Sequence, residues 1–141
     1  MSTTAIDALL LGGDLAIPDN ADDDALVTPS GDLALASGRD ALRRGLRRRV
    51  LASPGDLIHR PTFGAGVVDF LETALTLGRT SELGNRVRRQ ALQDVRVADA
   101  RLVTSLGLPG DTRAPNAVTL ELTVRLRQSL GDEQLTVSYA P

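Results

Sequence analysis

Hydrophobic residues recur every three or four positions in three stretches of this chain, a spacing that gives a helix one buried face. The first stretch begins near Gly38 and ends before Pro54-Gly55, a pair that stops helices. The second covers about residues 65–76, and the third begins near Thr80 or Ser81. We therefore predict three helices, whose apolar positions are Leu42, Leu46 and Val50; Val67, Phe70, Leu71, Ala74 and Leu75; and Leu83, Val87 and Ala91.

The period of the pattern falls to two after Val95, as expected for strands with one buried face. Residues 96–106 form the first such segment, and residues 118–127 form the clearest one. A loop containing Gly131-Asp132 follows, and then a last strand with alternating apolar residues, namely Leu135, Val137 and Tyr139. The pattern predicts a C-terminal three-stranded antiparallel meander, so that residues 37–141 form an α+β domain.

The first 36 residues have the composition of an irregular arm, because turn formers and like charges dominate them. Charge is unevenly spread, although the net charge is only −2. Residues 1–40 hold eight acids and one Arg, whereas residues 41–60 hold six Arg and one Asp. We therefore predict an acidic arm, residues 1–36, ahead of a domain with a basic surface.

The composition excludes several classes of protein. Aromatic residues make up 2% of the 141 residues, so the core is aliphatic. The absence of Cys excludes disulfides and zinc–thiolate sites. No apolar run approaches the roughly 18 residues that span a bilayer, so no membrane partner is expected. The run Asp22-Asp23-Asp24 lacks the alternating ligands of a calcium loop, and we predict neither metal nor cofactor.

Three features raise the question of catalysis. The stretch RPTFGAGVVDF, residues 60–70, looks faintly like a nucleotide loop, but Pro61 stands where a strand is needed and Asp69 would repel a pyrophosphate. His59 has no identifiable triad partner. Asp69 and Glu72, three residues apart, form the one carboxylate pair that a muramidase-like hydrolase could use. The hydrolase is kept as an alternative to a non-enzymatic protein.

The first predicted helix carries many arginines, among them Arg43, Arg44 and Arg47. Such a helix could contact nucleic acid phosphates. Aromatic residues for base stacking are missing, however, and arginine is well suited to ion pairs at protein interfaces. We expect these three arginines to bind protein partners and not nucleic acid, and a nucleic-acid-binding module stays as a second alternative.

Several of these residues, read in order, resemble one family. They are Gly38, Leu42, Leu46 and Val50; Ser53-Pro54-Gly55-Asp56; Arg60-Pro61-Thr62-Phe63-Gly64; and Asp94-Val95-Arg96-Val97 before the strands. The chain resembles, over about residues 32–141, the baseplate wedge and sheath-initiator family of contractile phage tails, also called lysozyme-like or baseplate assembly protein W. The family often has Glu-Pro-Arg where this chain has Asp94, Val95 and Arg96, so the proline is missing.

The resemblance implies a structural baseplate subunit without enzymatic activity that joins the wedge to the first sheath ring and initiates sheath assembly. Implied partners are the tail sheath protein, baseplate wedge proteins and tube or hub proteins, with several copies, six in a typical baseplate. The implied location is the virion tail baseplate, or the host cytoplasm during assembly. Arg96 carries an implied ion pair or partner contact.

The last predicted strand fits this role as a docking edge. Leu135, Val137 and Tyr139 alternate with Thr136 and Ser138, so no charge guards the strand. Natural edge strands usually carry Lys, Pro or a bulge that prevents unwanted pairing. We therefore expect Leu135, Val137 and Tyr139 to receive an extended segment of the sheath protein by strand addition.

Overall fold

The computed structural model of the chain describes residues 9–16, 27–71, 77–106, 118–127 and 132–139. The described residues form helices and two antiparallel sheets, so the α+β class is confirmed. The chain divides into two compact units, Met1–Leu46 and Arg47–Pro141. The predicted boundary at residue 36 is a different division, and it stays a prediction.

The first unit contains a small sheet in the segment that the sequence indicated as irregular. Strand β1 (Gly13–Leu15) pairs antiparallel with β2 (Leu35–Ser37). Its core consists of small side chains, namely Ala16, Ala36 and Ala41, with Ala34 packed against them. Alanines have weak hydrophobic periodicity, which is why the two strands were not predicted. Helix α2 (Gly38–Leu51) follows β2 directly.

The predicted helix positions are largely correct. Leu42, Leu46 and Val50 are all buried on α2. Helix α3 (Val67–Leu71) buries Val67 and Phe70, and the rest of the predicted second helix, including Glu72, lies outside the described residues. Helix α4 (Leu77–Leu92) starts before Thr80 and Ser81, so neither residue begins it as predicted. Leu83, Val87 and Ala91 on α4 are buried.

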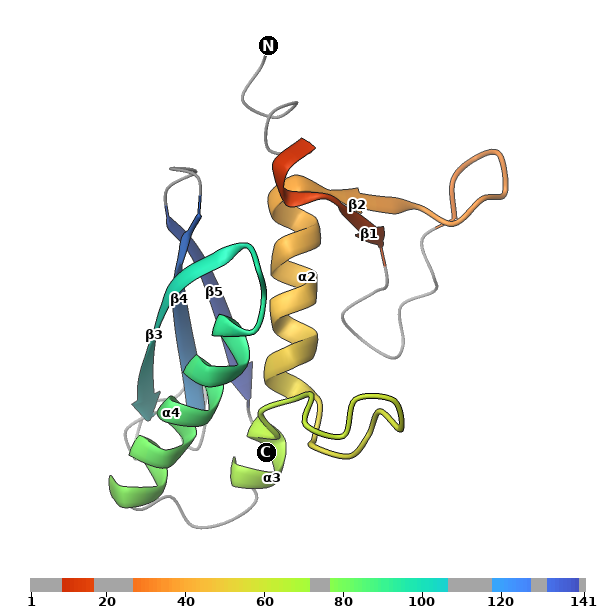
Figure 1. The fold of residues 1–141 in the computed structure, drawn as a ribbon. Helices are drawn as coiled ribbons and strands as arrows, with labels where there is room; N and C mark the ends of the chain where they lie inside the picture. Colours follow the sequence, from red (N-terminus) through yellow and green to blue (C-terminus); the bar gives the residue numbers. More distant parts are fainter. Residues whose placement is uncertain (1–8, 17–26, 72–76, 107–117, 128–131, 140–141) are drawn as a thin grey trace, which may run out of the picture. The chain divides into compact units, whose positions relative to one another are not determined.

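The second unit is built on a sheet of strand order β3-β4-β5, with α4 packed against β3 (Figure 1). The strands are β3 (Val97–Leu106), β4 (Val118–Leu126) and β5 (Asp132–Tyr139), and both pairs are antiparallel. Strand β5 includes Asp132 and Glu133, which the sequence pattern assigned to the preceding loop, so its first two residues are charged. Four alternating β4 residues are buried: Leu120, Leu122, Val124 and Leu126.

The loop of residues 52–66 joins α2 to α3 and packs back against the end of α2. The Ala65 N–H donates to the Arg49 carbonyl at 2.8 Å, and the Gly66 N–H donates to the Ala52 carbonyl at 2.9 Å. These bonds satisfy two carbonyls that the end of a helix leaves unpaired. Gly64 has φ +105°, and a Cβ there would lie 2.1 Å from the Ala52 carbonyl oxygen. The glycine-containing stretch is therefore loop main chain packed closely against the end of α2.

The buried side chain of Gln90 fastens the same loop to α4. Its Nε2 donates to the Thr62 carbonyl at 2.7 Å, and its Oε1 accepts the Gly64 N–H at 3.2 Å. One amide side chain thus pairs a donor and an acceptor of the loop main chain, which fixes the loop on the second unit.

Candidate functional site

The sheet presents two outer edges, β3 and β5, within the described part of the chain. The hydrogen-bond pattern shows which main-chain groups lie on each edge. The Arg127 N–H donates to the Arg96 carbonyl, so Val97 and Leu126 form a pair that exchanges no hydrogen bonds. A register shift lies between Val97 and Asp99. Beyond it, the Ala100 N–H and carbonyl point away from β4, because both are bonded to side chains instead.

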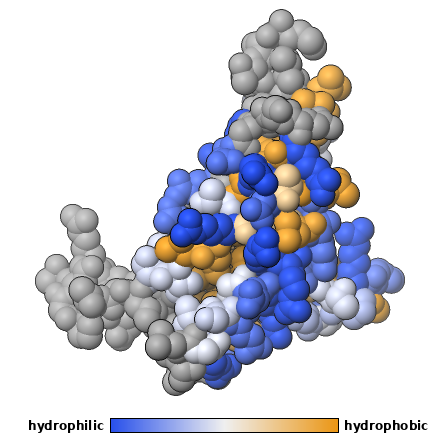
Figure 2. All heavy atoms as spheres, turned by 60° about the vertical axis from the view of Figure 1, so that its left-hand side comes forward, coloured by the Kyte–Doolittle hydropathy of each residue, from blue (hydrophilic) through white to orange (hydrophobic). Residues whose placement is uncertain are grey.

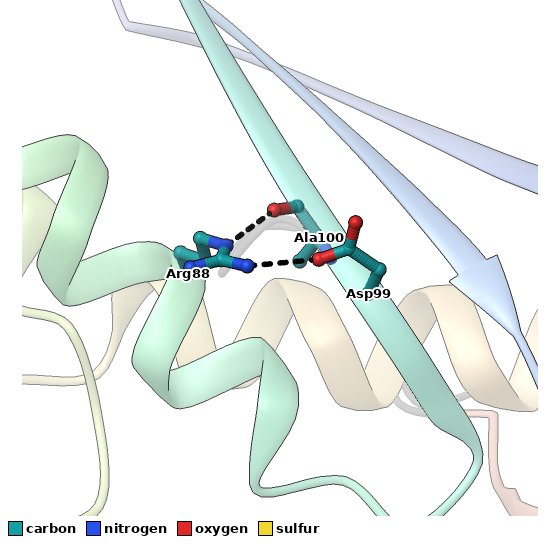
Figure 3. Close-up of polar contacts among 3 residues, drawn as sticks. All are labelled: Arg88, Asp99 and Ala100. Carbon is teal, nitrogen blue, oxygen red and sulfur yellow. Dashed lines mark hydrogen bonds and ion pairs between the residues drawn. The ribbon is translucent and has the colours of Figure 1, made fainter.

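The β3 edge is occupied at Ala100 by a contact from α4, which we call the Arg88 clamp. It consists of Arg88, Asp99 and Ala100 (Figure 3). Arg88 Nε donates to the Ala100 carbonyl and its Nη2 donates to Asp99 Oδ1, both at 3.0 Å. Asp99 Oδ1 also accepts the Ala100 N–H at 2.9 Å. Both main-chain groups that an added strand would need at this position are therefore occupied.

The electrostatics of the Arg88 clamp agree with its geometry. The hydrogen bond from Arg88 lowers the pKa of the Asp99 carboxyl, and the hydrogen bond from the Ala100 N–H adds to that effect. Asp99 therefore stays ionised at neutral pH. A charged residue and an irregular register on an edge strand are devices that natural sheets use against unwanted pairing.

The β5 edge differs from the β3 edge. Leu120 pairs with Val137, and Leu122 pairs with Leu135. Because β4 residues alternate in direction, Leu120 and Leu122 direct their main-chain groups at β5 and exchange hydrogen bonds with those partners. The N–H and carbonyl groups of Thr136 and Ser138 therefore face outward. No strand of the described residues pairs with that side of β5.

This register changes how the predicted docking residues would act. Leu135, Val137 and Tyr139 lie opposite Leu122, Leu120 and Val118 and use their main-chain groups on β4. The main-chain donors on the open edge come from the polar residues between them. The alternation of side chains identified the strand, but only the pairing pattern of β3 and β4 identifies the outward main-chain groups.

The predicted arginines lie in two places. Arg43, Arg44 and Arg47 are on α2, where Arg44 pairs with Asp40 at 3.0 Å. Arg96 lies just before β3 and binds Asp94 within the chain. Helix α2 and this turn are the elements that would present these arginines to a partner, and their partner contacts stay predictions.

Asp94 and Arg96 form a close, partly buried ion pair. Asp94 Oδ1 accepts from the Arg96 N–H at 3.0 Å and from its Nε at 2.8 Å, and Oδ2 accepts from Nη2 at 2.6 Å. Burial raises the pKa of the Asp94 carboxyl, but the hydrogen bonds and charge of Arg96 outweigh burial and lower it below its usual value. The pair holds the turn from α4 into β3 without the proline that the resembled family carries.

The possible catalytic residues do not form a described site. Asp69 Oδ2 accepts a hydrogen bond from Ser53 Oγ at 2.6 Å, which joins α3 to the loop after α2. Its suggested partner, Glu72, lies outside the described residues. The described residues contain no group of three or more His, Cys, Asp or Glu side chains placed to hold a metal ion. They also contain no helix with the length and apolarity to cross a membrane.

Sequence analysis missed the residues of the Arg88 clamp and Gln90. In the sequence, Arg88 is not distinguishable from other exposed arginines of an amphipathic helix. Asp99 is likewise not distinguishable from other polar residues of a strand. The one signal available was an acidic residue inside a segment with weak alternation. Gln90 follows the helical face of Val87 and Ala91, where a polar residue suggests a buried partner.

Comparisons with known proteins agree on the fold. No protein-family model and no curated protein sequence matches the chain. The chain is similar to a chain in the cryo-EM structure of the anti-feeding prophage (AFP) baseplate, with a TM-score of 0.60 and 22% identity, covering 86% of this chain and 88% of that one. It is also similar to the crystal structure of a candidate tail lysozyme from Geobacter sulfurreducens, with a TM-score of 0.55 and 17% identity, covering 76% and 94%. At these identities the likeness establishes a shared fold.

Proposed function

We propose that this chain is a structural subunit of the baseplate of a contractile tail or injection machine, and that it seeds the sheath by accepting an extended sheath segment on β5. The observation that carries the proposal is the difference between the two edges of the sheet. The Arg88 clamp occupies the main-chain groups of Ala100 on β3, whereas Thr136 and Ser138 of β5 direct main-chain groups outward. An edge whose main-chain groups face outward is suited to strand addition, in which main-chain hydrogen bonds supply the affinity.

The fold likeness supports the baseplate part of the proposal. One similar chain belongs to a baseplate that was reconstructed with 6-fold symmetry. We therefore propose several copies, six per baseplate, located in the tail or assembled in the host cytoplasm. The other similar chain is named for a lysozyme activity, but Asp69 of this chain is engaged with Ser53. We propose a non-enzymatic role for the chain.

The face of the molecule shown in Figure 2 also favours polar recognition over a broad apolar contact. That face, which is the left-hand side of Figure 1 brought forward, carries mostly hydrophilic residues among the described ones, with hydrophobic residues in small areas between them. Large continuous apolar patches usually mark stable hydrophobic interfaces. Main-chain pairing at an edge and ion pairs from α2 need no such patch.

The docking edge is tested by Thr136→Pro. Proline removes the outward N–H of Thr136 but leaves the bonds from β5 to β4, and edge strands tolerate proline when the missing N–H faces outward. We expect a folded monomer that no longer starts sheath polymers with the cognate baseplate and sheath proteins. Thr136→Val is the matched control, because it changes the side chain and keeps the N–H.

Two outcomes contradict strand addition on β5. One is normal sheath growth from folded Thr136→Pro protein. The other is loss of growth in both variants, since that result assigns the contact to the side chain. Val137→Pro is a poorer test, because the Val137 N–H faces Leu120 and its loss breaks the sheet itself.

We further propose that Arg43, Arg44 and Arg47 of α2 contact wedge, tube or hub proteins, with Arg96 as a further contact. Reversing the three α2 arginines to Glu should prevent incorporation into the baseplate while the monomer keeps its far-UV circular dichroism. Normal incorporation of the folded triple variant would assign the contact to another surface. Sheath growth and incorporation are separate readouts, so each part of the proposed function fails independently.

A further inference from the structure

A cavity of about 360 Å³ lies between the loop after α2 and the end of α4. Residues from three elements line it: Arg49 from the last turn of α2, His59 to Phe63 from the loop, and Gln93 after α4. Two of these side chains, Arg49 and Arg60, carry a full positive charge. All of the lining belongs to the second unit.

Both arginines lack a carboxylate within ion-pair distance among the described residues. Arg49 lies over the ring of Phe63, with its guanidinium carbon 4.8 Å from the ring centre. This cation–π contact holds the guanidinium at the cavity. The nearby carboxylate, Asp94, already makes a two-pronged pair with Arg96. The cavity is therefore electropositive, with little negative charge left to offset it.

The pKa of Arg49 is consistent with these electropositive surroundings. Burial lowers the pKa of its guanidinium, and the positive charges of Arg60 and Arg96 lower it further, although Asp94 raises it. A carboxylate placed between Arg49 and Arg60 would relieve this repulsion. Arginine also presents a planar fork of donors that fits a carboxylate.

The loop that carries Arg60 and Phe63 is held in place before any partner binds. Gln90 bonds its main chain at Thr62 and Gly64. A site whose geometry exists in advance loses less conformational entropy on binding. Two apolar residues of the same loop, Leu57 and Ile58, come shortly before Arg60 in the sequence. Both are exposed, Leu57 at 45% and Ile58 at 90%. The loop that lines the cavity thus also carries two exposed apolar residues, next in sequence to the lining residues.

We propose that this cavity binds a side-chain carboxylate from an acidic segment of another protein, with a neighbouring apolar residue of that segment resting on Ile58. Nucleic acid fits less well. The rings that line the site are those of Phe63 and His59, and Arg49 already covers the Phe63 ring, which leaves only the His59 imidazole as a platform for a base. The proposal is independent of strand addition on β5. It concerns charged side chains and not main-chain hydrogen bonds, and the residues lie far from β5 in sequence.

The test uses the full chain and a labelled, capped peptide of sequence Asp-Leu-Asp-Leu-Asp, with Asn-Leu-Asn-Leu-Asn as the matched control. The chain has three isoleucines, Ile6, Ile17 and Ile58, so methyl labelling of isoleucine gives a resolved reporter. We expect the Ile58 methyl resonance to shift with the acidic peptide and not with the amide peptide. Fluorescence anisotropy should show affinity that falls as salt rises.

The double variant Arg49→Gln, Arg60→Gln should weaken the acidic peptide at least tenfold. Arg101→Gln, which removes an exposed charge on β3, should change the affinity less than twofold. Three results overturn the proposal: equal binding of both peptides, equal losses in the two variants, or an unshifted Ile58 resonance. Tighter binding of a single-stranded oligonucleotide that depends on Arg49 and Arg60 would also overturn it, in favour of nucleic acid.

Discussion

Gly64 gives the strongest test of the loop geometry through the substitution Gly64→Ala. Gly64 has φ +105°, and an added Cβ would lie 2.1 Å from the Ala52 carbonyl oxygen and 2.7 Å from its carbon. These are main-chain atoms, so no side-chain rotation relieves the overlap. The Ala52 oxygen also accepts the Gly66 N–H at 2.9 Å, and a displaced oxygen would weaken that bond.

The expected loss of stability is the sum of three terms. The positive φ costs an L-residue about 1–2 kcal/mol. Forcing atoms into an occupied space typically costs about 1–3 kcal/mol. The weakened hydrogen bond adds about 1 kcal/mol. The sum of roughly 3–6 kcal/mol is a large share of the ~5–15 kcal/mol that stabilises a typical protein. A fall in Tm of about 10–20 °C follows.

Gly55→Ala is the matched control, because Gly55 has φ +99° and an added Cβ meets no atom within 4 Å. Its stability should fall only by the cost of the positive φ, about 1–2 kcal/mol. Urea and thermal unfolding followed by far-UV circular dichroism measure both variants. If Gly64→Ala is no more destabilising than Gly55→Ala, the close approach of the loop to Ala52 is wrong.

Three further predictions address other contacts. Arg88→Ala should lose about 1 kcal/mol with the hydrogen bond to Ala100 and should make the free protein self-associate in sedimentation experiments; a protein that stays monomeric at all concentrations contradicts the guarding role. Gln90→Leu should lose about 2–4 kcal/mol in urea unfolding, because two loop main-chain groups lose their partner; a neutral result would show that the loop is held otherwise. The lowered pKa of Asp94 means that its stabilisation is complete above its unfolded value of about 3.9 and is lost as pH falls through the folded value. Asp94→Asn should therefore lose about 1–3 kcal/mol at neutral pH and show a weaker acid dependence than the native chain; an unchanged acid dependence refutes this assignment.

The sequence predicted the elements whose side chains follow a strict period. The buried faces of α2, α4 and β4 carry leucines and valines at regular spacing, so both the type and the face of these elements were predicted correctly. Strand β3 was harder, because the register shift between Val97 and Asp99 interrupts its alternation and buries Ala100 in place of the residue that strict alternation would choose.

The functional details were less predictable, since they depend on contacts between distant residues. Arg88 meets Ala100 from another element, and nothing in the residues around either one encodes that meeting. The outward groups of β5 follow from bonds between β3 and β4 and not from β5 itself. The small sheet of β1 and β2 was missed because its core is made of alanines.

The Arg88 clamp also bears on how many strands the sheet can accept. A sheet with two usable edges is bivalent, and bivalent units that pair edge to edge grow into fibres without limit. A sheet with one usable edge is monovalent, and two such sheets that pair through β5 form a closed dimer in which growth ends. By occupying Ala100, the Arg88 clamp shortens the part of β3 that could pair with another strand, and so moves the sheet from the bivalent case toward the monovalent one.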